Sequence, residues 1–253
     1  MHSTEHARII RIQKNFASTM QVLECLVDAS NPIQSMIVSG APGIGKSWNI
    51  CKRLQELHDT AEINYSYLNG KCSTGGLYEA LYNARSKYSV LLLDDVEVFD
   101  SDDKMNLLKA ALDTGESRKI SWMSRTQTTL PKQFEFKGAV VFITNVNLAQ
   151  QALGSSGTAQ HTKAVLSRSI FIDLEIHDAE SIKAHVLNVL STSPICTRLG
   201  CTPEEQTEVL NFIAKYGEHI PNLSLRTPVL MSGIIKKYKN EWESICLQRL
   251  VQQ

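Results

Sequence analysis

The stretch from Ser39 to Ser47 constrains the fold of this chain more than any other. It reads Ser-Gly-Ala-Pro-Gly-Ile-Gly-Lys-Ser and matches the pattern G-x-x-x-x-G-K-[ST], with the apolar run 36–38 before it and a helical pattern after it. Its three glycines let the backbone form a concave loop whose N–H groups point inward, and the start of the following helix adds a partial positive charge. The pattern therefore predicts a strand–loop–helix unit that binds the phosphates of a nucleotide.

Particular roles follow for the residues of this loop. We expect Lys46 to reach the β and γ phosphates and to be required for catalysis, and we expect the Ser47 hydroxyl to be a ligand of Mg²⁺. The alternative is a chance glycine-rich turn, which the flanking strand and helix disfavour; hydrolysis is a separate question. The expected nucleotide contacts are Gly40, Ala41, Pro42, Gly43, Ile44, Gly45, Lys46, Ser47 and Trp48.

Composition excludes several classes of protein. Lys plus Arg and Asp plus Glu each total 26 among 253 residues, so any contact with nucleic acid must come from a local patch. The six cysteines show no zinc-ligand spacing and are interpreted as reduced thiols. No apolar run approaches the roughly 20 residues that span a bilayer, and the N-terminus lacks the apolar segment of a secretory signal. We expect a cytoplasmic protein without a membrane partner.

Hydrophobic patterning predicts strands that alternate with helices up to residue 174 and only helices beyond it. This order is typical of an α/β domain with a doubly wound parallel sheet, here residues 1–175 with an N-terminal helix, followed by a small helical domain, residues 176–253. The predicted strands are 34–39, 63–68, 89–95, 138–145 and 169–174. The predicted helices are 12–27, 48–58, 77–86, 103–112, 179–190, 203–216 and 225–252.

Polar side chains stand where two of the apolar strands end. Asp94 closes the run 89–95 and suits the acid that holds Mg²⁺ through water, while Asp95 beside it can polarise the attacking water, with Glu97 as the alternative base. Asn145 ends the next strand and can orient the same water, although Asn is also common where strands simply turn. These residues predict a hydrolytic site at the carboxyl edge of the sheet.

Two arginines are candidates for contact with the γ phosphate. Arg168 lies just before the last predicted strand, and Arg226 lies at the start of the final predicted helix. A guanidinium at the γ phosphate stabilises the charge that develops during phosphoryl transfer, so both are predicted to be catalytic, and Arg226 also to contact the nucleotide. The alternative for each is a solvated surface charge.

Taken together, these motifs resemble those of the AAA+ ATPases. The matching features are the Walker A loop Gly40–Ser47, the Walker B run Leu91–Asp95, sensor 1 at Asn145, the arginine finger at Arg168 and sensor 2 at Arg226. The resemblance implies a five-stranded parallel sheet in the order 5-1-4-3-2, a helical lid, and ATP hydrolysis in rings or spirals, usually hexamers. It also implies that Arg168 reaches the ATP of a neighbouring subunit, whereas Arg226 acts within its own.

One departure from the family pattern concerns the expected base. AAA+ proteins usually end Walker B in Asp-Glu, whereas this chain has Asp94-Asp95, and the shorter carboxylate predicts slower turnover. A narrower resemblance is to compact phage-encoded AAA ATPases. It rests on the segments 77–82, 91–95, 134–138 and 165–169.

Two loops bear on what such an ATPase would act on. The segment 70–76 contains Lys71 but none of the aromatic residues typical of protein-threading loops, which favours a phosphate backbone. The segment 117–137 combines cations with Trp122, which suits single-stranded nucleic acid; the alternative is a solvated hairpin with Trp122 in the core. The cations of this segment are Arg118, Lys119, Arg125, Lys132 and Lys137.

The leading hypothesis is an oligomeric ATPase that acts on nucleic acid in phage or plasmid replication, as a loader or translocase. Its expected partners are ATP, Mg²⁺, further copies of the chain, and single-stranded DNA or a replication protein. One alternative is an AAA+ remodeller of protein complexes. Another is a switch that binds ATP, oligomerises and hydrolyses slowly.

Overall fold

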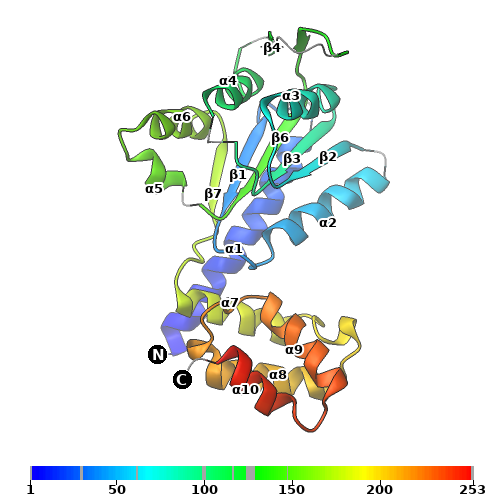
Figure 1. Ribbon diagram of the computed structural model, residues 1–253, viewed down its shortest axis with the longest axis vertical. Helices are drawn as coiled ribbons and strands as arrows, with labels where there is room; N and C mark the ends of the chain where they lie inside the picture. Colours follow the sequence, from blue (N-terminus) through cyan, green and yellow to red (C-terminus); the bar gives the residue numbers. More distant parts are fainter. Residues whose placement is uncertain are drawn as a thin grey trace. The chain divides into compact units, whose positions relative to one another are not determined.

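The chain divides into two compact units, each described here by itself. The computed structural model describes residues 2–28, 31–60, 62–98, 101–115, 117–123, 129–146 and 148–251 (Figure 1). The α/β unit comprises residues 16–39 and 46–174, and the helical unit comprises residues 1–15, 40–45 and 175–253. The division into domains 1–175 and 176–253 remains a prediction, since these units group residues by contact and include the loop 40–45 with the C-terminal helices.

Five parallel strands form the sheet of the α/β unit. Their order is β2-β3-β6-β1-β7, which confirms the order 5-1-4-3-2 when the strands of this sheet are numbered along the chain. All residues of β1, β3 and β6 are buried, as expected for apolar strands covered on both faces. The bounds are Ser35–Ser39 (β1), Asn64–Asn69 (β2), Ser89–Asp94 (β3), Ala139–Thr144 (β6) and Ile170–Asp173 (β7).

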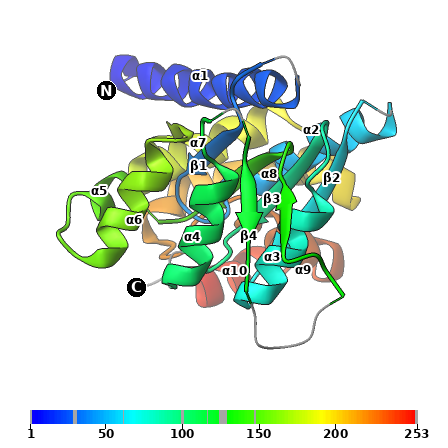
Figure 2. The ribbon, with the colours of Figure 1, turned by 90° about the horizontal axis from the view of Figure 1, so that it is seen from above.

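Helices cover both faces of this sheet. Figures 1 and 2 show α3, α4 and α6 on one face, where Ile37, Leu91 and Phe142 pack against Leu81 and Leu108. The other face carries α2 and the C-terminal part of α1. The helix bounds are His2–Val27 (α1), Lys46–Asp59 (α2), Thr74–Asn83 (α3), Asp102–Ala111 (α4), Leu148–Ala152 (α5) and Gly157–Leu166 (α6).

Three features of this unit differ from the sequence-based prediction. Helix α1 begins about ten residues earlier than predicted. Helices α5 and α6 were not predicted; Ser156 caps α6 by accepting a hydrogen bond from the Ala159 N–H, a side chain-to-backbone contact typical of helix starts. The segment 117–137 contains an antiparallel pair, β4 (Lys119–Ser121) and β5 (Gln133–Glu135), which Figure 2 shows beside α3 and α4.

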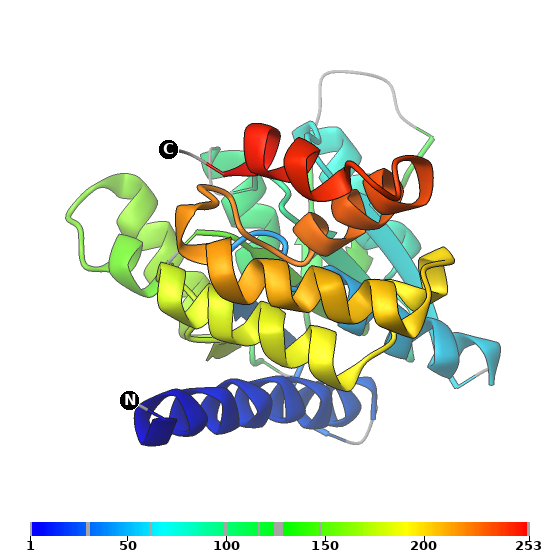
Figure 3. The ribbon, with the colours of Figure 1, turned by 90° about the horizontal axis from the view of Figure 1, so that it is seen from below.

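The helical unit packs its helices around a core of its own. Figure 3 shows α7 and α8 side by side, in yellow and light orange. A reciprocal pair of hydrogen bonds between Thr202 and Glu205 fixes the start of α8. The bounds are Ala179–Thr192 (α7), Thr197–Leu199 (η1), Pro203–Tyr216 (α8), Gly217–His219 (η2), Arg226–Lys237 (α9) and Trp242–Leu250 (α10).

The single helix predicted for residues 225–252 is wrong. It is divided into α9 and α10, because Tyr238 leaves the helical conformation with φ −130° and ψ 58°. The break lets the Trp242 ring pack 5.6 Å from that of Phe212, so tertiary burial overrides the local helical pattern. Within the described residues, no helix is both long enough and apolar enough to cross a membrane.

Candidate active site

The phosphate loop connects the end of β1 to the start of α2. Gly43 and Gly45 have φ values of 71° and 93°, a left-handed conformation that is costly for residues with a Cβ atom. Helix α2 begins at Lys46, directly after the loop. Two of the three glycines predicted to shape the loop thus adopt the backbone conformation for which glycine is suited, and Gly40 does not.

Lys46 is held by a polar side chain from a neighbouring strand. It is only 5% exposed, and its Nζ donates a hydrogen bond of 2.7 Å to Oδ1 of Asn145. Strands β1 and β6 are adjacent and parallel, so the residues that follow their carboxyl ends lie at one edge of the sheet. Two residues predicted separately, one from a glycine-rich motif and one from a strand end, are therefore in direct contact.

Asn145 also binds Asp95, the residue that directly follows β3. Its backbone N–H donates a hydrogen bond of 3.1 Å to Oδ1 of Asp95, and its side-chain amide donates to Oδ2 of the same carboxylate. Asp95 has φ 49°, which is uncommon for a residue other than glycine, and its own N–H donates to the carbonyl of Ile143. The result is a continuous chain of hydrogen bonds from Lys46 through Asn145 to Asp95.

Asp94 is buried next to this chain and has different partners. It is 4% exposed, and its Oδ2 accepts a hydrogen bond of 2.8 Å from the hydroxyl of Tyr67, which in turn accepts one from Asn69. Burial raises the pKa of Tyr67; the bond from Asn69 acts in the opposite direction, and the bond to Asp94 raises the pKa further. Burial and the nearby Asp94 charge also raise the pKa of the Cys51 thiol. Asp94 Oδ1 and the Ser47 hydroxyl are oxygen donors, the class that Mg²⁺ prefers alongside nucleotide phosphates, so the predicted residues fit this ion.

The alternative base, Glu97, is engaged elsewhere. Its carboxylate forms an ion pair with Lys71 at 3.2 Å, and its carbonyl accepts a hydrogen bond from Lys104. Both Glu97 and Lys71 are largely exposed, so the pair adds little stability. The structure brings Asp95, rather than Glu97, into the hydrogen-bonded chain with Lys46.

Arg168 lies after α6, immediately before β7. It is half-buried, and its guanidinium donates a hydrogen bond of 2.8 Å to the carbonyl of Ala164 in the preceding turn. This contact with the C-terminal end of α6 orients the Arg168 side chain. A role toward a neighbouring subunit remains a prediction.

In the helical unit, the segment Gly40–Gly45 is bound at several points. The N–H of Leu225 donates to the Gly43 carbonyl at 2.9 Å, and the N–H of Ala41 donates to the Ile176 carbonyl at 2.9 Å. A Cβ atom on Gly43 would lie 2.8 Å from Cβ of Ser224, so glycine is needed for space as well as for φ. Arg226 follows directly as the first residue of α9 and is exposed.

Sequence reasoning missed the role of His185 on α7. Its Nε2 lies 2.9 Å from the Ile44 carbonyl oxygen and must carry the proton, since a carbonyl only accepts. Burial lowers the pKa of His185, although the bond to Ile44 acts in the opposite direction. Tyr67 and Asn69 were missed as well. Nothing in the local pattern of either segment signals contact with Ile44 or Asp94.

The two loops predicted to contact a substrate lie against each other. The centres of the Trp122 and Tyr78 rings lie 5.3 Å apart. A Cβ atom on Gly75 would lie 3.0 Å from Cη2 of Trp122. Trp122 is half-buried, and Arg118 is buried beside Phe136. The hairpin alternative thus agrees with the described residues of this segment, while Arg125 lies outside them.

The parallel sheet order, the phosphate loop and the C-terminal helices define the AAA+ class, and the chain has the AAA+ fold. It is similar to domain III of the replication initiation protein DnaA from Thermotoga maritima, with a TM-score of 0.51 and 16% identity over 93% of this chain and 92% of that one. It is also similar to NtrX from Brucella abortus in complex with ATP, with a TM-score of 0.51 and 11% identity over 97% of this chain and about half (53%) of NtrX.

The chain belongs to the same family as a phage protein. It is 38% identical over 239 residues to the uncharacterized 36.7 kDa protein in the nrdC-mobD intergenic region of Enterobacteria phage T4, a match that covers 93% of this chain and 73% of the phage protein. No protein-family model matches the chain. The relative agrees with the predicted resemblance to phage-encoded AAA proteins.

Proposed function

We propose that this protein is an ATPase that binds ATP with Mg²⁺ at its phosphate loop and hydrolyses it within an oligomer. The observation that carries the proposal is the hydrogen-bonded chain Lys46–Asn145–Asp95 at the edge of the sheet where Asp94 also lies. A cation for phosphates, an amide for the water and a carboxylate base are the groups that phosphoryl transfer requires. The AAA+ fold, and the ATP bound by the similar NtrX, support the choice of nucleotide.

Each residue has a distinct role in the proposed reaction. Lys46 binds the β and γ phosphates, and Ser47 and Asp94 would hold Mg²⁺, which neutralises charge on the phosphates. Asp95 accepts the proton of the attacking water, and Asn145 orients that water. Arg226 contacts the nucleotide of its own subunit, and Arg168 that of a neighbour, by analogy with the AAA+ family.

The contacts of Asn145 favour slow turnover. Both oxygens of Asp95 accept hydrogen bonds from Asn145, so Asn145 competes with water for the carboxylate. Asn145 likewise competes with phosphate oxygens for the ammonium group of Lys46. This observation supports the second candidate function, a slowly hydrolysing switch that oligomerises with ATP.

The proposed substrate of the motor is nucleic acid, in a loader or translocase of replication. Supporting features are the similarity to a replication initiation protein domain, the phage relative, and the exposed cations Lys119 and Lys132 on the β4–β5 hairpin. The alternative function is a remodeller of protein complexes, in which the same loops would bind a protein partner.

Steady-state ATP hydrolysis tests these functions together. We expect turnover per subunit to rise with protein concentration, because Arg168 completes the site of a neighbour, and to rise further with single-stranded DNA in a salt-sensitive manner. Turnover that depends on concentration but ignores DNA would favour a protein remodeller. Tight ATP binding with almost no turnover would favour the switch, and absence of ATP binding would refute the proposal.

A further inference from the structure

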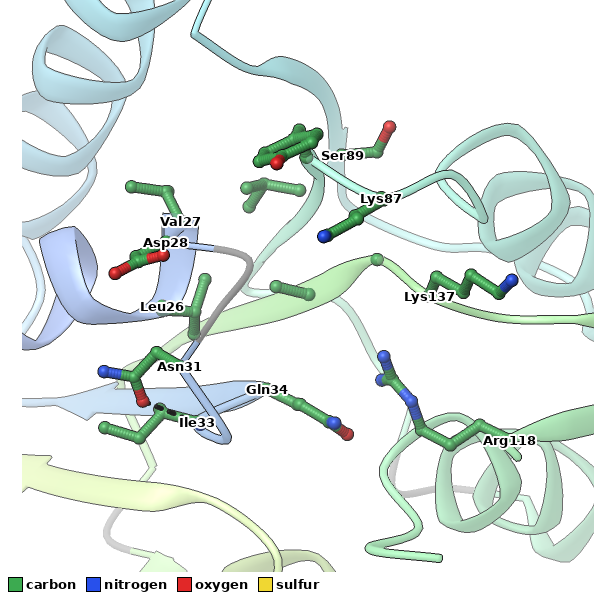
Figure 4. Close-up of a pocket in the computed structure, with 14 residues that line it drawn as sticks. Leu26, Val27, Asp28, Asn31, Ile33, Gln34, Lys87, Ser89, Arg118 and Lys137 are labelled. Atoms are coloured by element: carbon green, nitrogen blue, oxygen red, sulfur yellow. Dashed lines mark hydrogen bonds between the residues drawn. The ribbon is translucent and has the colours of Figure 1, made fainter. Parts of the chain in front are cut away.

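A pocket opens at the edge of the sheet where the strands begin, opposite to the edge that carries Asp94 and Asn145. It lies within the α/β unit, among the end of α1, the starts of β1, β3 and β6, and the β4 region (Figure 4). Nothing in the proposed ATPase reaction uses this edge. Its ionisable lining groups are Asp28, Lys87, Arg118 and Lys137, so cations exceed carboxylates.

Arg118 is the central group of this pocket. The residue is only 7% exposed, its guanidinium lies 5.0 Å from the centre of the Phe136 ring, and one nitrogen donates a 2.8 Å hydrogen bond to the Ala111 carbonyl. Among the described residues no further hydrogen bond of this guanidinium is found, and none of its nitrogens is a fully buried atom without a partner, so they face the open pocket. Burial lowers the pKa of Arg118 to about 10, so the group stays charged at neutral pH. A largely buried cation that faces an open pocket favours an anion there.

The neighbouring groups add to this preference. Figure 4 shows Lys87 and Arg118 pointing toward the middle of the pocket from different sides, with the amide of Gln34 near Arg118. Lys137 points away and forms an ion pair with Glu135 at 3.0 Å, so the carboxylate whose charge acts on Arg118 is already paired. Asp28 lies on the other side of the pocket, next to α1. Lys87 and Arg118 are thus the cations directed at an incoming ligand.

Tyr88 indicates which anion the pocket accepts. A planar guanidinium fork beside an ammonium group matches the oxygens of a phosphate. Tyr88 lines the pocket and is 51% exposed, and Nζ of Lys87 lies 5.2 Å from the centre of its ring. Its backbone has φ 63°, which turns the chain between α3 and β3. An exposed aromatic ring beside cations is the arrangement on which single-stranded nucleic acid stacks its bases.

We propose that this pocket binds a backbone phosphate of single-stranded nucleic acid, with Arg118 and Lys87 contacting the phosphate and Tyr88 stacking against a base. The choice of occupant rests on the proposed action on nucleic acid, whereas the preference for phosphate rests on the pocket alone. The site is at the opposite edge of the sheet from Asp94. Nucleic acid would therefore bind at one edge of the sheet and ATP would be hydrolysed at the other.

Backbone-amide NMR titrations test this site on the full chain saturated with ADP. The two probes are a short oligothymidylate and inorganic phosphate. We expect both to shift the amide signals of Ser89 and Gly138, which line the pocket. Lys87→Ala should weaken oligonucleotide binding about fivefold and reduce the slope of log K against log salt by about 0.7, the value for one phosphate contact. The matched control Lys163→Ala removes an exposed charge on α6, outside the lining, and should change affinity less than about twofold.

Two further variants separate the parts of the site. Tyr88→Asn keeps a residue that tolerates positive φ but removes the ring, so it should weaken the oligonucleotide about tenfold and leave the response to inorganic phosphate unchanged. Arg118→Lys keeps the charge but not the fork and should weaken both probes. The melting temperature of Arg118→Lys must be measured, because Arg118 also bonds Ala111. If this variant does not fold, the results for Lys87→Ala and Tyr88→Asn test the site without it.

The outcomes are distinct. Equal losses for Lys87→Ala and Lys163→Ala would show diffuse surface charge and overturn the proposal. A pocket response to inorganic phosphate alone would overturn the nucleic-acid occupant, and a response to neither probe would overturn the site. Shifts of the Gly43 and Gly45 amides by ADP report separately on the ATPase proposal, so either proposal can fail without the other.

Discussion

Nζ of Lys46 lies 2.7 Å from Oδ1 of Asn145, which joins the start of α2 to the residue that follows β6. In the proposed ATP complex, phosphate oxygens also become partners of the ammonium group, which has three N–H donors. The side-chain amide of Asn145 donates at the same time to Asp95. One side chain therefore connects the proposed phosphate-binding cation to the proposed base.

Replacing Lys46 tests the phosphate loop directly. Lys46→Ala removes the cation that faces two phosphates, and each charge-assisted hydrogen bond contributes roughly 1.5–3 kcal/mol, so ATP affinity should fall at least about 100-fold. Equilibrium titration with a fluorescent ATP analogue measures this change. Lys132→Ala, which removes an exposed charge from the β5 side of the hairpin, is the control. Undiminished affinity of Lys46→Ala would contradict the assignment of the loop.

The identity of the base is tested by a pair of matched variants. Asp95→Asn should keep ATP affinity and lose turnover by a factor of about 10²–10⁴, the usual contribution of a general base. Glu97→Gln breaks only the exposed pair with Lys71 and should leave turnover within about twofold. Single-turnover hydrolysis with bound ATP measures both. If Glu97→Gln is inactive and Asp95→Asn is not, the base is Glu97.

How far the sequence predicts this molecule depends on the range of the interactions involved. The glycines of the phosphate loop, the buried strand before Asp94 and the polar residue after β6 are visible in short stretches, because local backbone geometry and burial on both faces of the sheet dictate them. Parallel pairing then brings the ends of these strands to one edge. The convergence of Lys46, Asn145 and Asp95 could be anticipated on that basis.

Other features depend on contacts between distant segments and could not be anticipated. Tyr67 and Asp94 lie 27 residues apart, and only the pairing of β2 with β3 brings the hydroxyl to the carboxylate. His185 reaches Ile44 across 141 residues. The division of α9 from α10 is similar, since the local pattern continues through Tyr238 while the burial of Trp242 against Phe212 requires a break.

Arg168 is predicted to act on the nucleotide of a neighbouring subunit. Arg168→Ala should leave ATP affinity nearly unchanged but reduce turnover by a factor of about 10³, as loss of an arginine finger does. Mixing it with Lys46→Ala subunits should restore part of the activity, because each variant supplies what the other lacks. Since Arg168 also bonds Ala164, melting curves must show that the variant folds. No recovery at any mixing ratio would contradict action in trans.

His185 should make stability depend on pH. Since burial lowers its pKa in the folded protein, the unfolded chain takes up the proton first as the pH falls. The stability it contributes is therefore fully present above the unfolded pKa of about 6.5 and is lost as the pH falls through the lower, folded pKa. His185→Gln keeps a donor for Ile44 without titrating. Melting temperatures of the native protein should fall more steeply than those of the variant between about pH 7 and pH 5, and parallel curves would contradict this role.

Tyr67 should tune the binding of Mg²⁺ through its hydrogen bond to Asp94. The hydroxyl binds one oxygen of Asp94, so the other oxygen is the one that would hold Mg²⁺. Loss of such an outer partner typically costs about tenfold or more in metal affinity. Tyr67→Phe should therefore raise the Mg²⁺ concentration needed for half-maximal turnover about tenfold, while metal-free nucleotide affinity stays constant. Tyr65→Phe is the matched control, because the Tyr65 hydroxyl bonds Gln55 on α2 instead of an acid. An equal shift in both variants, or none in Tyr67→Phe, would mean that the hydroxyl only completes the packing of β2.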